Sequence, residues 1–436
     1  MLKKSFKNGR KSTIQFEIYA LNATLKQKIV ACVSETITLL WWIGKKMIAR
    51  KLEKTFYEAL KEYPVVTVFG PRQSGKTTLA KAYCPNFTYV NLEDRETREL
   101  AKEDYKAFFH RYPPPVIIDE IQRVPELTSA VQILVDSNRE LAGQFVLTGS
   151  HQTELAEAVD QSLAGRTSVL ELYPLSLEEL GDVKKYVSTD TLLLQGFMPE
   201  LHASHKNPTR YYRNYLRTYV ERDVRKLVNV RDLILFERFV TLLAGRIGQV
   251  VNFSSLAGET GVSSSTIMSW MSILEASFLI YRLPPYFSNI SKRMVKSPKV
   301  YFTEPGLAAF LLGIETERQM STHPLRGELF ENMVVMEALK AFANDGRESR
   351  MALLRTEKGF EIDLMLSHGV NVQPVEIKSA MTFNRKLIHN LETYMKEDES
   401  AVQPTLVFDG DDIPFFGEQR VRIRNIRNWH PDELWK

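Results

Sequence analysis

Apolar residues follow two different spacings along the chain, and the change divides it into regions. Between Pro64 and about Ser176, short continuous apolar runs alternate with helical segments. Such runs are typical of strands buried on both faces of a parallel sheet that carries helices on each side. The predicted strands are Val65–Phe69, Thr88–Leu92, Val116–Asp119, Phe145–Thr148 and Val169–Leu172. The pattern therefore predicts an α/β domain, which Pro174 ends.

Helical spacing dominates the next part of the chain, over residues 177–320. A helix is predicted over Arg210–Val228, and Phe253–Ser277 has the pattern of a helix-turn-helix. Ser254 and Ser263 are suitable N-caps, and Gly261 is suited to the turn. The strand-like segment after this run, residues 278–283, would complete a winged helix.

The last part opens with a predicted helix, Glu328–Asn344, and continues with short strands and turn signals. We therefore expect four regions: an extension at 1–46, an α/β domain at 47–176, a helical region with a winged helix at 177–320, and a second α/β domain at 321–436. The extension starts with a basic run and ends in Trp41-Trp42. Because it differs from the rest of the chain, we expect the folded domains not to need it.

Composition, charge and cysteine content indicate which class of protein the chain belongs to. With 436 residues, 44% hydrophobic and 25% charged, the chain has the balance of a folded globular protein. The net charge of +4 allows a nucleic-acid partner without requiring one. Cys32 and Cys84 lack metal-ligand spacing and are too few for a disulfide framework. The apolar stretch at 30–43 is too short and too interrupted to span a bilayer, so we expect a cytoplasmic protein with no membrane partner.

A glycine-rich loop follows the first predicted strand. It matches G-x-x-x-x-G-K-[ST], and a helix-forming segment comes after it. In such a loop, backbone N–H groups and the helix N-terminus bind phosphates, the lysine reaches the β- and γ-phosphates, and the threonine hydroxyl binds magnesium. We therefore expect ATP and Mg²⁺ as ligands. The predicted nucleotide-binding residues of this loop are Gly70, Pro71, Arg72, Gln73, Ser74, Gly75, Lys76, Thr77 and Thr78.

Two acids end the third predicted strand, Asp119 and Glu120. Ligands sit at the carboxyl edge of parallel strands, so both acids should face the nucleotide. We expect Asp119, with Thr77, to hold magnesium and Glu120 to polarise the attacking water. The predicted strand at 145–148 should lie between the first and third strands, where Thr148 or Ser150 would act as a sensor of the γ-phosphate.

Arg166 follows a predicted helix at Ala156–Leu163 and admits two interpretations. It is placed to act as an arginine finger in a neighbouring subunit, which would imply a homo-oligomer. Alternatively, it is an ordinary cation at a helix C-terminus.

From Met47 onward, the chain resembles a large family of bacterial and archaeal AAA+-like ATPases that carry a C-terminal domain of uncharacterised function. The resemblance implies an ATPase and leaves its purpose open. The chain departs from the family pattern near Gly196-Phe197 and at Glu304-Pro305-Gly306. The motifs that carry the resemblance are Gly70–Thr77, Asp119–Gln122, Leu147–Ser150, Leu163–Arg166, Phe197–Glu200, Tyr219–Asp223, Arg326–Glu331 and Val375–Lys378.

The winged helix raises the question of DNA binding. Its second helix offers Ser, Thr, Met and Trp270 but no lysine or arginine, which disfavours sequence-specific readout. Basic residues nearby would allow non-specific contact with a phosphate backbone. The alternative is a lid that packs on the ATPase. These basic residues are Arg210, Arg213, Arg217, Arg222, Arg225, Lys226, Lys292, Arg293, Lys296 and Lys299.

Two strands of the last region bring acids and a lysine together. Glu361 and Asp363 share one face of a predicted strand, and Glu376 and Lys378 share one face of the next. The spacing D-x(12)-E-x-K is that of PD-(D/E)xK nucleases, in which Asp363 and Glu376 would bind a metal and Lys378 would act on water. Glu331, on the preceding helix, is expected to face this site.

The sequence therefore favours a magnesium-dependent ATPase coupled to a nuclease-like domain that contacts DNA. The rival hypothesis is a regulatory or scaffolding ATPase whose C-terminal half binds a protein partner and cuts nothing.

Overall fold

The computed structural model describes residues 48–150, 161–204, 206–219, 233–286, 297–398, 400–418 and 420–435, together with Val159 and Val224. The extension predicted at 1–46 lies outside this part of the chain. So do half of the helix predicted at 156–163 and most of the second half of the one predicted at 210–228.

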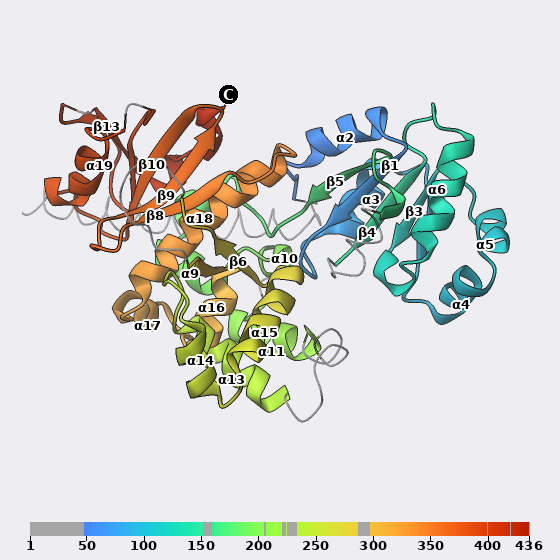
Figure 1. Cartoon of the computed structure of the whole chain (residues 1–436), viewed down its shortest axis with the longest axis horizontal. Helices are drawn as coiled ribbons and strands as arrows, with labels where there is room; N and C mark the ends of the chain where they lie inside the picture. Colours follow the sequence, from blue (N-terminus) through green and yellow to red (C-terminus); the bar gives the residue numbers. More distant parts are fainter. Residues whose placement is uncertain are drawn as a thin grey trace, which may run out of the picture. The chain divides into compact units, whose positions relative to one another are not determined.

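A five-stranded parallel sheet forms the first domain, in the order β2-β3-β4-β1-β5 (Figure 1). The predicted place of the fourth strand between the first and third is confirmed. The strands β1, β3 and β4 are buried along their whole length, as their apolar sequences require. The strands are β1 Val65–Phe69, β2 Thr88–Asn91, β3 Val116–Asp119, β4 Phe145–Gly149 and β5 Thr167–Glu171. The fifth strand begins two residues earlier than predicted.

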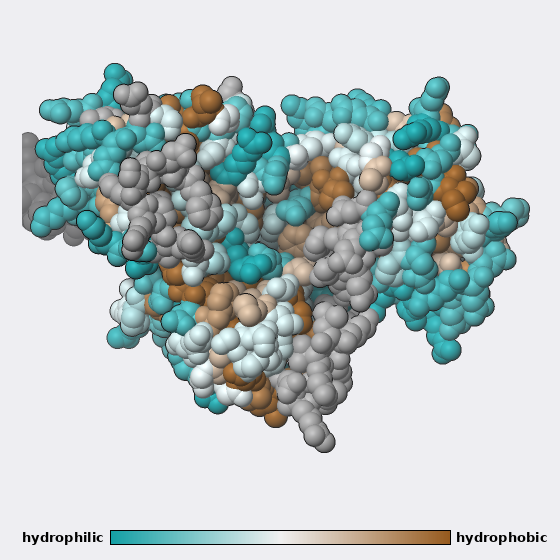
Figure 2. All heavy atoms as spheres, viewed as in Figure 1, coloured by the Kyte–Doolittle hydropathy of each residue, from teal (hydrophilic) through white to brown (hydrophobic). Residues whose placement is uncertain are grey.

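One helix precedes the first strand, and further helices connect the strands. They are α2 Glu53–Glu62, α3 Lys76–Tyr83, α4 Arg95–Glu103, α5 Tyr105–Arg111, η1 Ile121–Arg123 and α6 Leu127–Ser137. Asp94 and Asp104 cap α4 and α5 by accepting backbone N–H groups of the first turn. Figure 2 shows the hydrophilic surface that these two helices present.

The middle region is helical, as predicted. Its helices are α8 Val183–Tyr186, α9 Thr189–Gln195, α10 Pro199–Ser204, α11 Pro208–Tyr219, α13 Leu233–Ala244, α14 Phe253–Thr260, α15 Ser264–Ala276, α16 Pro305–Leu311 and α17 Glu317–Thr322. The antiparallel strands β6 (Ile280–Leu283) and β7 (Lys299–Phe302) follow α14 and α15, where the wing was predicted.

In the helix-turn-helix, one of the two predicted N-caps differs from the structure. Ser263 caps α15 and Gly261 takes the left-handed conformation at the end of α14, both as predicted. The prediction that Ser254 caps α14 is wrong. Asn252 caps it instead, because its side chain accepts the backbone N–H of Ser255, so the helix starts at Phe253.

A mixed six-stranded sheet forms the C-terminal domain, in the order β12-β13-β11-β10-β9-β8. Strands β8, β9 and β10 form an antiparallel meander, and β11 then pairs in parallel with β10 after a helix. The elements are α18 Arg326–Asn344, β8 Met351–Arg355, β9 Glu361–His368, β10 Asn371–Lys378, η4 Arg385–Ile388, α19 His389–Tyr394, β11 Thr405–Phe408, β12 Ile413–Phe416, β13 Val421–Asn425, η5 Ile426–Asn428 and η6 Pro431–Leu434.

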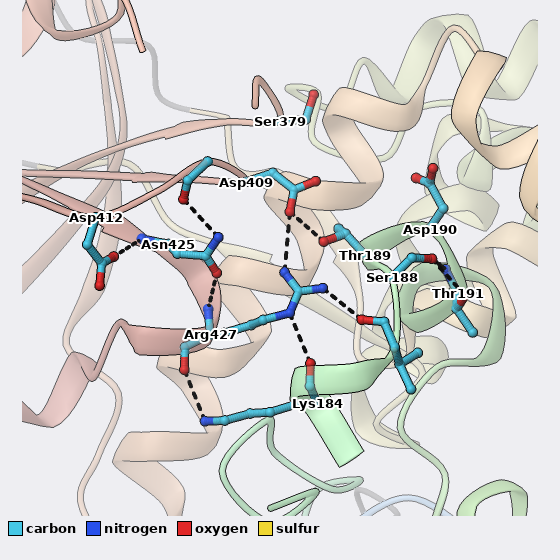
Figure 3. A network of polar contacts seen from close by, with 12 residues as sticks. Lys184, Ser188, Thr189, Asp190, Thr191, Ser379, Asp409, Asp412, Asn425 and Arg427 are labelled. Atoms are coloured by element: carbon cyan, nitrogen blue, oxygen red, sulfur yellow. Dashed lines mark hydrogen bonds and ion pairs between the residues drawn. The ribbon is translucent and has the colours of Figure 1, made fainter. Parts of the chain in front are cut away.

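Polar contacts join the C-terminal sheet to the segment around α8 and α9 (Figure 3). The guanidinium of Arg427 donates to the carbonyl oxygens of Lys184 and Val187, at 3.0 Å each, and Lys184 Nζ donates back to the Arg427 carbonyl oxygen. Arg326 pairs with Asp190 at 2.7 Å and with Asp409 at 3.1 Å. These buried or half-buried pairs make the middle and C-terminal regions one packed body.

In the part of the chain that is described, no helix is both long and apolar enough to cross a membrane.

Candidate functional site

The glycine-rich loop runs from the end of β1 to the start of α3. Gly70 has φ +150° and lies against the strand end of β5: a Cβ built on it would be 2.2 Å from the carbonyl oxygen of Leu172. Gly75 has φ +101° and precedes α3 in the left-handed region. Both backbone conformations favour glycine, so the loop can turn its N–H groups inward.

Lys76 lies at the first position of α3 and is buried. Its ammonium donates to the carbonyl oxygens of Gly70 and Pro71 at 2.9 and 2.8 Å. The cation is thereby held over the loop, where phosphate groups would bind.

Three hydroxyl groups surround the carboxylate of Asp119 at the end of β3. Thr77 donates to it at 3.0 Å and Tyr89 at 2.8 Å, and Thr148 also donates to it. Magnesium prefers oxygen ligands, and a hydroxyl next to a carboxylate supplies two. Thr77 and Asp119 therefore fit a magnesium ion.

Glu120 follows Asp119 in the left-handed conformation, with φ +60°. Gln122 donates through Nε2 to Glu120 Oε2 and, at 3.0 Å, to Ser150 Oγ. Burial raises the pKa of Glu120, and the cations of Lys76 and Arg72 oppose that rise. A carboxylate with a raised pKa is a stronger base than an exposed one.

The other predicted loop residues are placed around this group. Gln73 accepts a hydrogen bond from Tyr211 of α11, and Ser74 is fully buried. Thr78 is exposed on α3, and Arg72 is half-buried. The structure thus places Lys76, Thr77, Asp119, Glu120 and Ser150 at one edge of the sheet.

Arg166 is not part of this group. Its guanidinium pairs with Asp136 on α6 through two bonds of 2.7 and 2.9 Å, and it donates to the carbonyl oxygen of Ala164 at 3.0 Å. The bond to Ala164 supports the interpretation as a cation near a helix C-terminus. The role of an arginine finger stays a prediction.

Several contacts of the glycine-rich loop and of the acids beside it were not predicted. Arg50 donates to the carbonyl oxygens of Ser74 and Tyr173, at 2.6 Å each, and pairs with Glu179 at 3.0 Å. It therefore fixes the glycine-rich loop to the segment after β5. Gln122 lies in a motif that carried the family resemblance, which was a usable signal; Arg50 had no comparable signal.

The predicted C-terminal residues come together on α18, β9 and β10. Lys378 Nζ is 2.9 Å from Asp363 and 3.1 Å from Glu376. Lys299 Nζ is 2.8 Å from Glu331 and 2.6 Å from Glu361. We call Glu331, Glu361, Asp363, Glu376 and Lys378 the C-terminal cluster. Burial, with the neighbouring carboxylate of Asp363, raises the pKa of both Glu331 and Glu376.

The C-terminal cluster, as arranged, does not fit a divalent ion. Each of its carboxylates is paired with a lysine, and Glu361 also pairs with Arg355 at 3.3 Å. Among the residues that the structure describes, no three His, Cys, Asp or Glu side chains form a group that could hold a metal.

The prediction of a basic face near the winged helix is wrong for one of its residues. Lys299 is buried, so its assignment to a phosphate-contacting surface is wrong. Arg210, Arg213 and Arg217 are exposed on α11. Trp270, on the helix that would read DNA, packs against Phe236 and Phe239. The other six basic residues of that face lie outside the described residues.

The fold and this site define a P-loop domain of the AAA type, a class that binds ATP. Residues 62–181 match a family described as an AAA domain. Residues 187–318 and 326–427 match two families, each described as a domain of unknown function.

Relatives of the chain extend over several of these domains. Uncharacterized proteins of Mycobacterium tuberculosis and Mycobacterium bovis are each 29% identical over 345 residues, which cover 78% of this chain and 75% of theirs. An uncharacterized protein of Haemophilus influenzae is 24% identical over 331 residues, covering 68% of this chain and 80% of its own. Among solved structures, a Walker-type ATPase of Pyrococcus abyssi is 14% identical, with a TM-score of 0.38, and covers 61% of this chain and 96% of its own.

Proposed function

We propose that the AAA domain hydrolyses ATP with magnesium. The observation that carries this proposal is the position of Glu120, next to the hydrogen-bonded pair of Thr77 and Asp119 and beside the lysine-bearing loop. Asp119 is sufficient to hold magnesium together with Thr77. The second acid, Glu120, therefore supports a further role in the proposal, the activation of water.

Each residue has a role in the proposal. Lys76 leaves its two carbonyl partners to bind the β- and γ-phosphates. Thr77 and Asp119 hold magnesium, which when bound neutralises charge on the phosphates. Glu120 accepts a proton from the attacking water, and burial raises its pKa toward the range that this step needs.

Gln122 and Ser150 form the sensor of the site in this proposal. Gln122 donates to both Glu120 and Ser150, so a movement of Ser150 would change the hydrogen bonding of Glu120. The hydroxyl of Thr148 already donates to the carboxylate of Asp119. In this proposal, Ser150 is therefore the hydroxyl that contacts the γ-phosphate. Arg166 would complete a neighbouring subunit's site only after releasing Asp136.

Phosphate release from ATP tests the proposal. The wild-type protein should release phosphate with magnesium and not after chelation. Asp119→Asn should lower the rate at least tenfold, while Asp411→Asn, which changes an exposed acid, should leave it unchanged. A wild-type protein that binds ATP and magnesium without turning ATP over would refute hydrolysis and leave nucleotide binding.

For the C-terminal domain, the pairing of all four carboxylates with cations favours the second hypothesis, a regulatory ATPase that cuts nothing in this arrangement. A nuclease assay with magnesium or manganese, comparing the wild type with Asp363→Ala, distinguishes the two. Cleavage by the wild type that Asp363→Ala removes would reverse this choice.

A further inference from the structure

Arg50 holds one peptide unit of the glycine-rich loop. Its Nη1 donates to the carbonyl oxygen of Ser74 at 2.6 Å, and its Nη2 donates to the carbonyl oxygen of Tyr173, also at 2.6 Å. A Cβ built on Gly75 would lie 3.5 Å from Nη1, so the guanidinium lies against the peptide that joins Ser74 to Gly75.

This contact sets the direction of the next N–H group. The carbonyl of Ser74 and the N–H of Gly75 belong to one trans peptide unit, so they point in opposite directions. Because Arg50 holds the carbonyl oxygen on its own side of the loop, the N–H of Gly75 is directed to the other side. In loops of this kind, phosphates accept such backbone N–H groups.

Gly75 allows the same peptide a second orientation. Its φ is +101°, and glycine tolerates both signs of φ. Rotation of the peptide changes only ψ of Ser74 and φ of Gly75, so the backbone of Gly75 opposes it weakly. The contact from Arg50 is therefore what favours one orientation over the other.

Glu179 connects Arg50 to the segment that follows β5. Its Oε1 accepts from Arg50 Nε at 3.0 Å, and its Oε2 accepts the backbone N–H of Ser176 at 2.8 Å. The side chains of Arg50 and Glu179 are only 9% and 2% exposed. A buried ion pair needs good geometry and further hydrogen bonds, so a displacement of Ser176 would disturb Arg50.

Helix α18 of the C-terminal domain holds the residues on either side of Ser176. Glu337 accepts the backbone N–H of Leu177 at 2.8 Å, and Lys340 Nζ donates to the carbonyl oxygen of Leu175 at 2.7 Å. Glu337 and Lys340 are buried and pair with each other at 2.9 Å. A continuous series of polar contacts thus runs from α18 to the glycine-rich loop.

We propose that Arg50 is a positioning residue for phosphate binding and that α18 regulates the nucleotide site through it. Arg50 keeps the N–H of Gly75 toward the phosphates. A movement of α18 against residues 175–177 shifts Glu179, releases Arg50 and lets the peptide rotate, which lowers the affinity for phosphates. The proposal rests on phosphate binding by the loop and not on hydrolysis, so absence of turnover would leave it intact.

Calorimetric titration of the full-length chain with ADP and with inorganic triphosphate, in magnesium, tests the role of Arg50. Arg50→Lys keeps the charge but cannot make three planar contacts, so it should bind both ligands about tenfold more weakly. The loss should be equal for the two ligands, because both carry phosphates and only ADP has a base. Arg111→Lys, at an exposed position of α5, is the control and should bind as the wild type does.

A double-mutant cycle tests the route from α18. Glu337→Gln has one acceptor oxygen where the carboxylate serves both Leu177 and Lys340, so it should weaken binding of both ligands about threefold. Added to Arg50→Lys, it should cause no further loss, because the released peptide no longer depends on α18. Glu328→Gln, at a half-exposed position of the same helix, should bind normally.

Should Arg50→Lys fail to fold, Glu179→Gln leaves Arg50 in place and weakens only its anchor. It should lower the affinity for both ligands by the same factor. Contacts that only stabilised the fold would lower the melting temperature and leave the affinities of the folded variants unchanged, which would refute the proposal. Losses that multiply in the double variant would refute the route from α18.

Discussion

The hydroxyl of Tyr211 donates a 2.5 Å hydrogen bond to Oε1 of Gln73, and so joins helix α11 to the glycine-rich loop. Gln73 has φ +62°, a conformation that a non-glycine residue adopts only when its surroundings hold it. Tyr211 is buried on a helix of the middle domain. A change in the conformation of Gln73 on nucleotide binding would therefore alter a contact with helix α11 of the middle domain.

Tyr211→Phe should weaken ATP binding about fivefold, because the loss of one hydrogen bond costs about 1 kcal/mol and leaves the loop less ordered. Calorimetry with ATP measures the change. Tyr219→Phe removes a hydroxyl of the same helix that contacts Ser277 instead, and should leave affinity unchanged. Equal losses in the two variants would show that the effect comes from helix packing.

Lys76→Ala should abolish tight ATP binding, because it removes the main cation at the β- and γ-phosphates. The measurement is the dissociation constant for ATP. Lys54→Ala, which removes an exposed lysine of α2, is the control and should bind normally. Near-normal affinity in Lys76→Ala would contradict the assignment of the loop.

Glu120→Gln should bind ATP and turn it over at least a hundredfold more slowly, since an amide cannot accept the proton of water. Steady-state kinetics should show the loss in kcat. Glu126→Gln changes an exposed acid just before α6 and should not affect the rate. Turnover at the wild-type rate would mean that another group activates water.

Glu304 makes stability depend on pH. It is 1% exposed, and burial raises its pKa to about 7, against the opposing effect of Lys340 and of the backbone N–H groups of Phe197 and Gly306. Because the native state holds the proton more tightly than the unfolded chain, this contribution is complete below about pH 4.5 and is lost as the pH rises to about 7. At about 1.4 kcal/mol per pKa unit, the loss is on the order of 3 kcal/mol.

Melting curves between pH 5 and 8 check this. The wild type should lose stability relative to Glu304→Gln over that range, because the amide has no proton to release. Glu357→Gln, at an exposed position, should track the wild type. Parallel pH profiles for the wild type and Glu304→Gln would show that Glu304 does not titrate there.

Removal of residues 1–46 should leave ATP hydrolysis unchanged, since each nucleotide-site motif begins at Gly70 or later. The truncated and full-length chains are compared in the same phosphate-release assay. A truncated protein that folds but does not hydrolyse ATP would assign a function to the extension.

Local sequence was sufficient for the elements whose pattern is continuous. The strands β1, β3 and β4 are unbroken apolar runs, and the glycine-rich loop is one uninterrupted motif, so both could be predicted. The start of α14 was missed because Asn252 and Ser254 are both good caps, and only the fold decides which side chain reaches an N–H group.

Contacts between distant residues could not be predicted in the same way. Tyr211 and Lys299 reach their partners across domains, and Arg50 reaches Ser74 within one domain. No spacing in the sequence relates these residues to Gln73, Glu331 or Ser74. Lys299 was assigned to a basic surface because it follows other basic residues. Its burial comes from the pairing of β7 with β6, which turns the side chain toward α18.

The polar contacts of Arg427 and Arg326 limit which segments of the chain can be exchanged between related proteins. Their partners include Lys184, Val187 and Asp190, which precede the C-terminal domain by well over a hundred residues. A chimaera that swapped residues 326–427 alone would bring two foreign surfaces against these groups. Recombination should therefore preserve function only when the α8–α9 segment is inherited together with the C-terminal sheet.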